Sequence, residues 1–192
     1  MSEKVYITAQ SLLDDSYRLA IKVLEDGFRP DFIVGIWRGG TPVGIAVQEL
    51  LQYFGIPTDH ISIRTSSYSS MTRSEGAVAV HGLGYVIRNI DSEDSLLIVD
   101  DVYDTGLSVK AVIDTLYLKA RKNTPHDIRI ATPYFKPGKN RTDRVPNYYI
   151  HETEDWLVFP HELQGLTVDE IHENKPSMAE LLKGVEALKS YQ

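Results

Sequence analysis

The chain contains no cysteine among its 192 residues. That absence excludes disulfide bonds, thiolate zinc sites and a cysteine nucleophile, so packing alone has to stabilise the fold. Positive charge is also scarce, because 20 Lys and Arg stand against 27 Asp and Glu and give a formal net charge of -7. General nucleic-acid binding depends on many Lys and Arg side chains that neutralise phosphates. The charge balance therefore argues against a nucleic-acid partner.

Long apolar runs are missing as well. No stretch approaches the length that crosses a bilayer, and the start, MSEKVYITAQ, lacks the basic and apolar regions of a secretory signal. We therefore expect no membrane partner and a cytoplasmic location. The sequence also has no repeat, low-complexity tract or long linker. These features predict a single domain over residues 1–192.

Apolar segments alternate with amphipathic ones along the chain. DFIVGIW (31–37), SLLIVDD (95–101) and DIRIATPYF (127–135) are typical of buried strands, and helical patterns separate them. Such alternation indicates an α/β fold with a largely parallel sheet covered on both faces. Two short apolar segments, residues 77–82 and 84–90, are predicted to form a hairpin or an edge pair.

Polar loops follow three of the predicted strands. They are WRGG (37–40), DDVYDTG (100–106) and KPG (136–138). In parallel sheets, ligands bind beyond the carboxyl ends of the strands, near the point where the strand order reverses. We therefore expect these three loops to meet at one edge of the sheet and to form a ligand site there.

The middle loop combines acidic groups with the start of a helix. Three carboxylates follow the buried strand within five positions: Asp100, Asp101 and Asp104. The segment DTGLS (104–108) adds two hydroxyls, a glycine that permits close approach, and the unpaired first amides of a helix. This combination favours a phosphate cradle, while the carboxylates suit sugar hydroxyls or a divalent metal. The predicted ligand is a ribose phosphate.

Other ligand-binding motifs do not match. A P-loop needs G-x-x-x-x-G-K before Ser or Thr, and none occurs. GLGYVI (82–87) lacks the third glycine of a dinucleotide-binding motif. The spacing of the carboxylates fits neither a calcium loop nor an Asp-x-Asp phosphatase, and a simple helix cap would need only one Asp.

The motifs together resemble one family. LLIVDDVYDTGLS (96–108) resembles the phosphoribosyl-pyrophosphate signature of the type I phosphoribosyltransferases, and WRGGTPVG (37–44) resembles their pyrophosphate loop. SSYSSMTR (66–73) is similar to their flexible catalytic loop. YFKPG (134–138) and EDWLVFPHE (154–162) resemble base-binding elements of the purine branch, particularly the bacterial xanthine-guanine and hypoxanthine enzymes.

The resemblance implies a fold and an activity. The implied fold is a mostly parallel central sheet flanked by helices, with a small base-binding hood at about residues 136–165 and a C-terminal helical extension at about residues 166–192. The implied enzyme depends on Mg²⁺, forms a dimer or tetramer, and transfers 5-phosphoribose from phosphoribosyl pyrophosphate to hypoxanthine, guanine or xanthine. The alternative is a regulatory homologue that senses this donor without turnover. Such regulators often carry a nucleic-acid-binding domain or a basic face, and neither is evident here.

Site residues follow from the resemblance, position by position. Asp100 and Asp101 would accept hydrogen bonds from the ribose hydroxyls directly or through Mg²⁺, with Asp101 as the metal ligand. Asp104 would be the general base that takes the proton from N7 of the purine. The 5'-phosphate would be held by four consecutive residues: Thr105, Gly106, Leu107 and Ser108.

The remaining expectations concern pyrophosphate and the base. Arg38 and the Gly39 amide would bind pyrophosphate after a cis peptide bond between residues 37 and 38, and Arg73 of the flexible loop would reach the same group. Lys136 would donate a hydrogen bond to O6 and so select 6-oxopurines over adenine. Base binding would be completed by stacking on Trp156 and by the backbone of Leu157. The sequence does not rank the three 6-oxopurines.

Overall fold

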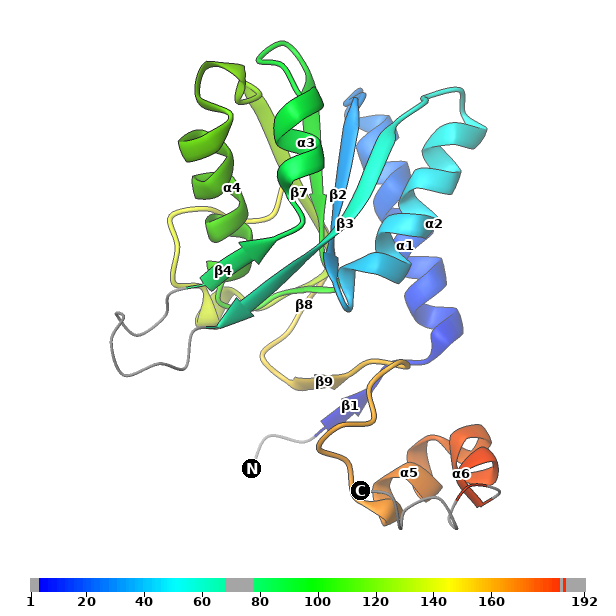
Figure 1. Ribbon diagram of the computed structural model, residues 1–192. Helices are drawn as coiled ribbons and strands as arrows, with labels where there is room; N and C mark the ends of the chain where they lie inside the picture. Colours follow the sequence, from blue (N-terminus) through cyan, green and yellow to red (C-terminus); the bar gives the residue numbers. More distant parts are fainter. Residues whose placement is uncertain (1–3, 68–77, 184, 186–192) are drawn as a thin grey trace, which may run out of the picture. The chain divides into compact units, whose positions relative to one another are not determined.

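The structure is a computed structural model that describes residues 4–67, 78–183 and 185 (Figure 1). The chain divides into two compact units. The larger unit is Ala9–Asp155, and the smaller one combines the residues up to Thr8 with those from Trp156 onward. The two units are described separately below.

The larger unit is built on a seven-stranded sheet. Its strands are β2 (Phe32–Trp37), β3 (Asp59–Ser67), β4 (Val78–His81), β5 (Ser95–Val99), β6 (Val102–Tyr103), β7 (Asp127–Phe135) and β8 (Tyr148–Glu152). The order is β4-β3-β2-β5-β7-β6, and β8 pairs with β7. Every pair is parallel except β3 with β4. The predicted α/β fold with a mostly parallel sheet is thereby confirmed.

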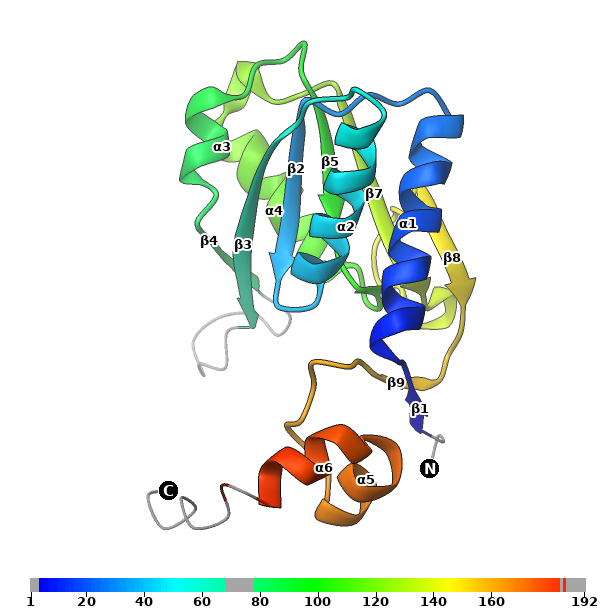
Figure 2. The same cartoon turned by 90° about the vertical axis from the view of Figure 1, so that its right-hand side faces the viewer.

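Helices cover both faces of this sheet (Figures 1 and 2). They are α1 (Ala9–Glu25), α2 (Gly40–Tyr53), α3 (Gly84–Asn89) and α4 (Leu107–Lys119), with single 3₁₀ turns at Arg121–Asn123 and Pro137–Lys139. Helices α1 and α2 lie on one face, and α3 and α4 lie on the other. On the α3/α4 side, Val112 and Leu116 are fully buried against Val34, Ile98 and Ile130 of three strands. The strands read as apolar throughout because both of their faces are buried.

Parallel registry aligns the ends of the central strands. Gly35 of β2 lies opposite Val99 of β5, and Val99 lies opposite Ala131 of β7. The loops that follow these strands therefore leave the sheet on the same side. This arrangement confirms that the three polar loops share one edge, which is the edge where parallel sheets bind ligands.

The prediction for residues 84–90 is wrong. This segment forms helix α3 rather than a strand, and β4 pairs with β3 instead of with a following strand. The buried residues Leu83, Val86 and Ile90 are spaced by three and four positions, so they lie on one face of a helix. A run this short is compatible with the two-residue period of a strand and with the 3.6-residue period of a helix. Packing of its apolar face into the core decides between them.

The smaller unit pairs the beginning of the described chain with its later part. Strand β1 (Lys4–Tyr6) is parallel to β9 (Trp156–Val158), and helices α5 (Val168–Asn174) and α6 (Pro176–Lys183) follow. A capping box between Thr167 and Glu170 begins α5. The sequence indicated a helical C-terminal extension, but neither α5 nor the β1–β9 pair was anticipated. None of the described helices has the length and apolar character that a membrane crossing requires.

Candidate active site

An open pocket of about 220 Å³ lies at the carboxyl end of β5. It is lined by residues from the loop after that strand and from the first turn of α4: Asp100, Asp101, Val102, Tyr103, Asp104, Thr105, Gly106, Ser108 and Val109. All the signature residues that the sequence singled out, except Leu107, therefore line one hollow. None of the residues listed is Lys or Arg, so a phosphate held there would rely on amides and hydroxyls.

Two glycines bring the loop after β2 against the acidic pair. A β-carbon on Gly39 would overlap the carboxylate of Asp101, which is 9% exposed. A β-carbon on Gly40 would overlap the carbonyl oxygen of Val99 and would lie 2.8 Å from the α-carbon of Asp100. At Gly40 the overlap is with backbone atoms, so a side chain there does not fit, whereas at Gly39 a side chain would have to displace the Asp101 carboxylate. The predicted pyrophosphate loop and the predicted ribose carboxylates are thus in direct contact.

Asp100 is a perturbed acid of the site. Burial raises the pKa of its carboxyl well above the usual range, and the neighbouring charge of Asp101 raises that pKa further. Backbone amides of Asp101, at 3.0 Å, and of Gly40 donate to Asp100 and partly oppose the shift. The two carboxylates therefore resist being charged together. A ligand that brings positive charge or hydroxyl donors would relieve that repulsion.

The predicted phosphate cradle is shaped by the turn that begins α4. Gly106 has a φ of +74°, a left-handed conformation that favours glycine, and it is the N-cap of the helix. The amide of Leu107 donates to Thr105 Oγ1 at 3.4 Å. From the neighbouring strand β3, Thr65 Oγ1 donates to Ser108 Oγ at 3.4 Å. The hydroxyls proposed from sequence thus surround the helix amino terminus, where unpaired amides and the helix dipole favour an anion.

Asp104, which lines the pocket, lies close to Lys136 of the loop after β7. Lys136 Nζ lies 3.6 Å from Asp104 Oδ2, and Lys139 Nζ lies 4.0 Å from the same oxygen. The Lys136 side chain is 6% exposed, whereas that of Asp104 is 40% exposed. Burial lowers the pKa of Lys136, and the negative charge of Asp104 works against that shift. The predicted general base and the predicted O6 donor are therefore neighbours.

Backbone hydrogen bonds fix the turn that carries Lys136. The amide of Lys136 donates to the carbonyl oxygen of Tyr103 at 2.9 Å, which joins the end of β7 to β6, the strand before Asp104. In the following 3₁₀ turn, the amide of Gly138 donates to Glu154 Oε1 at 2.6 Å. Because these contacts are to the backbone, they position the lysine without involving its ammonium group.

The remaining expected residues are distributed as follows. The peptide bond between Trp37 and Arg38 is cis, as the resemblance implied, and the Arg38 side chain is exposed. Arg73 lies outside the described residues. Trp156, which is 58% exposed, and Leu157, which is 7% exposed, belong to the smaller unit. Their roles in base binding stay predictions.

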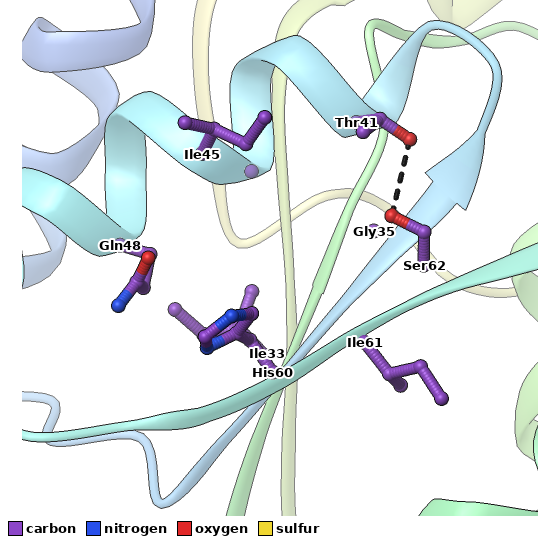
Figure 3. Close-up of a pocket in the computed structure, with 9 residues that line it drawn as sticks. Ile33, Gly35, Thr41, Ile45, Gln48, His60, Ile61 and Ser62 are labelled. Atoms are coloured by element: carbon purple, nitrogen blue, oxygen red, sulfur yellow. Dashed lines mark hydrogen bonds between the residues drawn. The ribbon is translucent and has the colours of Figure 1, made fainter.

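A second, smaller hollow lies between α2 and strands β2 and β3 (Figure 3). Thr41 Oγ1 and Ser62 Oγ are hydrogen bonded at 3.2 Å at one end of it, as the dashed line in the figure shows. Its volume of about 70 Å³ is room for a few water molecules and not for a sugar phosphate. None of the candidate site residues that the structure describes lines it.

The residues present fit Mg²⁺ only as a partly substrate-held ion. Among the described residues there is no group of three or more His, Cys, Asp or Glu side chains that could hold a metal. Mg²⁺ usually keeps several waters and is bound through one or two carboxylates together with substrate phosphates. Asp101, buried beside Gly39, together with Asp100 provides such a carboxylate pair. The donor set therefore fits an ion that arrives with a phosphorylated ligand.

Tyr103 was not among the residues predicted for the site, yet its hydroxyl reaches a second loop. That hydroxyl is 2.9 Å from Thr142 Oγ1, and it donates to the carbonyl oxygen of Arg144 at 3.2 Å. This loop belongs to the segment KNRTDRVP (139–146), which is basic within an acidic chain. Its contact with the phosphate cradle had no sequence signal because it depends on tertiary packing.

Comparison with known proteins identifies the family. Residues 6–166 match the phosphoribosyl transferase domain, which is most of the chain. The chain belongs to this family. Its fold, predicted from the signature, is thereby confirmed as that of a phosphoribosyltransferase.

The individual proteins that this phosphoribosyltransferase resembles are named as purine or hypoxanthine enzymes of the same family. A hypoxanthine/guanine phosphoribosyltransferase of Aciduliprofundum boonei (strain DSM 19572 / T469) is 33% identical over 105 residues, and the match spans only about half of each protein, 54%. A purine phosphoribosyltransferase of Pyrococcus horikoshii Ot3 is 29% identical, with a TM-score of 0.64 over 85% of this chain and 97% of that one. The hypoxanthine phosphoribosyltransferase of Staphylococcus aureus is 20% identical, with a TM-score of 0.57 over 76% and 74%, and it supports the fold alone.

The raised pKa of Asp100 predicts a stabilising substitution in the ligand-free phosphoribosyltransferase. A carboxyl whose pKa is higher in the folded state than in the unfolded state costs stability as the pH rises from the unfolded value toward the folded one, so the penalty is present at neutral pH and fades in acid. Asp100→Asn keeps the acceptor oxygen for the two amides and removes one charge. We expect its Tm at pH 7.5 to rise by at least about 2–4 °C, the shift that ~1 kcal/mol gives in a protein of this size.

Thermal unfolding measured from pH 8 down to pH 4 tests this expectation. The gain from Asp100→Asn should shrink as the pH falls and the wild-type carboxyl takes up its proton. A variant that is less stable than the wild type at every pH would contradict it.

Proposed function

We propose that this phosphoribosyltransferase transfers 5-phosphoribose from phosphoribosyl pyrophosphate to a 6-oxopurine, namely hypoxanthine, guanine or xanthine, and releases pyrophosphate. The observation that carries the proposal is the contact between Gly39 and the buried Asp101 carboxylate. This contact joins the loop that would hold the pyrophosphate to the loop that would hold the ribose, and the bond between those two groups is the one that breaks. The names of the relatives, which include purine and hypoxanthine/guanine enzymes, support the same choice of base.

Each end of the donor has suitable groups in the pocket. The amino terminus of α4, with Thr105 and Ser108, suits the 5'-phosphate, and Asp100 and Asp101 suit the ribose hydroxyls because carboxylates are acceptors. Positive charge grows on the sugar as pyrophosphate leaves, and a carboxylate pair below the ring would stabilise it. Arg38 and the Gly39 amide would bind the departing pyrophosphate. Mg²⁺, when bound, would supply positive charge against the phosphate oxygens.

The base would be recognised on the other side of the pocket. Lys136 suits a 6-oxo group because its ammonium donates and cannot accept, whereas the 6-amino group of adenine would face it with another donor. Asp104, 3.6 Å from that ammonium, suits the proton of N7, since a base held by Lys136 would bring its imidazole edge to the adjacent carboxylate. We further propose that Trp156 stacks on the base, that Leu157 meets its N1 and C2 edge, and that the enzyme is a cytoplasmic homo-oligomer.

The direct test is incubation of the purified protein with Mg²⁺, phosphoribosyl pyrophosphate and each of four bases: hypoxanthine, guanine, xanthine and adenine. We expect nucleoside monophosphate and pyrophosphate from at least one 6-oxopurine and far less from adenine. Chromatography of the products measures both. Donor binding by calorimetry without any product would instead favour the regulatory homologue that senses the donor.

Asp104→Asn should separate binding from turnover. The amide cannot take up the N7 proton, so we expect kcat to fall by about 10²–10⁴-fold, the usual contribution of a general base. The affinity for phosphoribosyl pyrophosphate, measured by calorimetry, should change little. Asp114→Asn, which alters an exposed carboxylate on α4 paired with Lys110, is the matched control. Turnover of Asp104→Asn at the wild-type rate would remove the residue from this role.

Lys136→Ala should weaken selection between bases. We expect the ratio of kcat/KM for hypoxanthine over adenine to fall at least about tenfold, because the donor that pairs with O6 is lost. Lys139→Ala is the control, since Lys139 lies 4.0 Å from the same Asp104 oxygen but is exposed. Equal ratios for the Lys136→Ala variant and the wild type would show that O6 is read elsewhere.

A further inference from the structure

A polar contact under the phosphate cradle has no part in the roles given above. It is centred on Tyr103, a core residue that is 2% exposed, whose ring packs edge-on against Phe135 with centroids 5.8 Å apart. A phenylalanine would fill this place in the core equally well. The hydroxyl therefore calls for a separate explanation.

The hydroxyl lies directly beneath the residue that shapes the cradle. A β-carbon on Gly106 would come within 2.5 Å of the Tyr103 hydroxyl oxygen and 2.8 Å of Thr142 Oγ1. Gly106 is the N-cap of α4, and its carbonyl oxygen accepts from the amide of Lys110 at 2.9 Å. The two hydroxyls thus pack directly against the first turn of α4 at Gly106.

Thr142 belongs to a turn that closes on itself. Its amide donates to Asn140 Oδ1 at 2.9 Å, and Asn140 Nδ2 donates to the carbonyl oxygen of Arg144 at 2.7 Å. Thr142 Oγ1 lies 2.9 Å from the Tyr103 hydroxyl and 3.0 Å from Asn140 Oδ1. Because each hydroxyl carries one hydrogen, one hydrogen joins the two hydroxyls and the other is donated to the carbonyl oxygen of Arg144 or to Asn140 Oδ1 of the turn. This turn, residues 140–144, is called the support turn below.

A backbone hydrogen bond joins the support turn to the cradle at a second point. The amide of Arg141 donates to the carbonyl oxygen of Thr105 at 3.0 Å. The support turn also begins directly after the 3₁₀ turn that follows Lys136. Tyr103 itself accepts from the Lys136 amide at 2.9 Å through its own carbonyl oxygen. One residue therefore connects the base-binding lysine with the phosphate cradle, by its carbonyl on one side and its hydroxyl on the other.

We propose that Tyr103 is a positioning residue whose hydroxyl, through Thr142 and the support turn, holds the cradle of residues 105–108 in the conformation that binds the 5'-phosphate. The inference rests on the proposed function, because the phosphate in question is that of phosphoribosyl pyrophosphate and of the nucleotide product. The cradle has no lysine or arginine of its own, so its affinity depends on how well its amides and hydroxyls are aligned. Loss of the hydroxyl should therefore weaken phosphate binding while the acid–base groups stay in place.

The test compares Tyr103→Phe with Tyr148→Phe. Tyr148 is also buried, at 6% exposure, and its hydroxyl also has two partners, Asp26 at 2.8 Å and Arg129 at 2.6 Å. Those partners lie toward the opposite end of β7 from Lys136, so Tyr148→Phe costs buried hydrogen bonds without touching the cradle. Both variants are first compared for Tm, and kinetics are measured well below the lower of the two values.

In Tyr103→Phe we expect KM for phosphoribosyl pyrophosphate to rise about 5- to 20-fold, the factor that corresponds to about 1–2 kcal/mol of lost hydrogen bonding. KM for the base and kcat should stay within about threefold of the wild type. Thr142→Val should behave like Tyr103→Phe, and Thr142→Ser, which keeps the hydroxyl, should restore the wild-type value. The double variant Tyr103→Phe/Thr142→Val should be no worse than the poorer single variant, because both remove one contact.

A binding experiment separates this inference from the proposed function. Calorimetry with ribose 5-phosphate and with ribose reports the phosphate contribution without any turnover. We expect Tyr103→Phe to lose affinity for ribose 5-phosphate and Tyr148→Phe to keep it. An inactive wild type with this same binding pattern would contradict the proposed function and leave the positioning role supported. Equal donor KM values in Tyr103→Phe and the wild type, or an equal rise in Tyr148→Phe, would overturn the positioning role.

Discussion

Repulsion between two neighbouring carboxylates is the constraint around which the site is arranged. Asp100 and Asp101 leave the end of β5 side by side, and burial makes their joint ionisation costly. Such a pair is retained only where something compensates for it, since marginal stability leaves little room for unpaired buried charge. Amides of Asp101 and Gly40 donate to Asp100 and offset part of the rise in its pKa. In the proposed function, a ligand that brings hydroxyl donors or a cation would offset more of it.

That constraint determines the residues around it. The loop after β2 can approach the acidic pair only with Gly39 and Gly40, because any side chain there would overlap Asp101 or the backbone of β5. The loop after β7 approaches from the other side and places Lys136 beside Asp104. Parallel pairing of β2, β5 and β7 brings all three loops to one edge. The pocket is therefore a consequence of sheet topology, and its chemistry is a consequence of which loops the strand order makes neighbours.

The proposed phosphate cradle would let an acidic protein bind a polyanion. The chain has a formal net charge of -7, and none of the pocket-lining residues that the structure describes is basic. Attraction for phosphate then has to come from oriented amides and hydroxyls at the amino terminus of α4, where small errors of alignment weaken every contact at once. The buried Tyr103 hydroxyl and the support turn give that alignment a physical basis. In the same way, Lys136 is positioned through its backbone, which leaves its ammonium group available.

Several features followed from the sequence because they depend on local chemistry. The apolar strands, the alternating helices and the signature at residues 96–108 predicted the α/β fold and the grouping of Asp100, Asp101, Asp104 and the residues of the first turn of α4. Segment 84–90 was assigned wrongly because a short apolar run fits a strand and a helix equally until its partners are known. The pairing of β1 with β9 joins segments about 150 residues apart, and no local pattern encodes such a contact. Tertiary structure alone decided that the hydroxyl of Tyr103 would meet Thr142, since hydrogen bonds between distant side chains depend on how the whole chain packs.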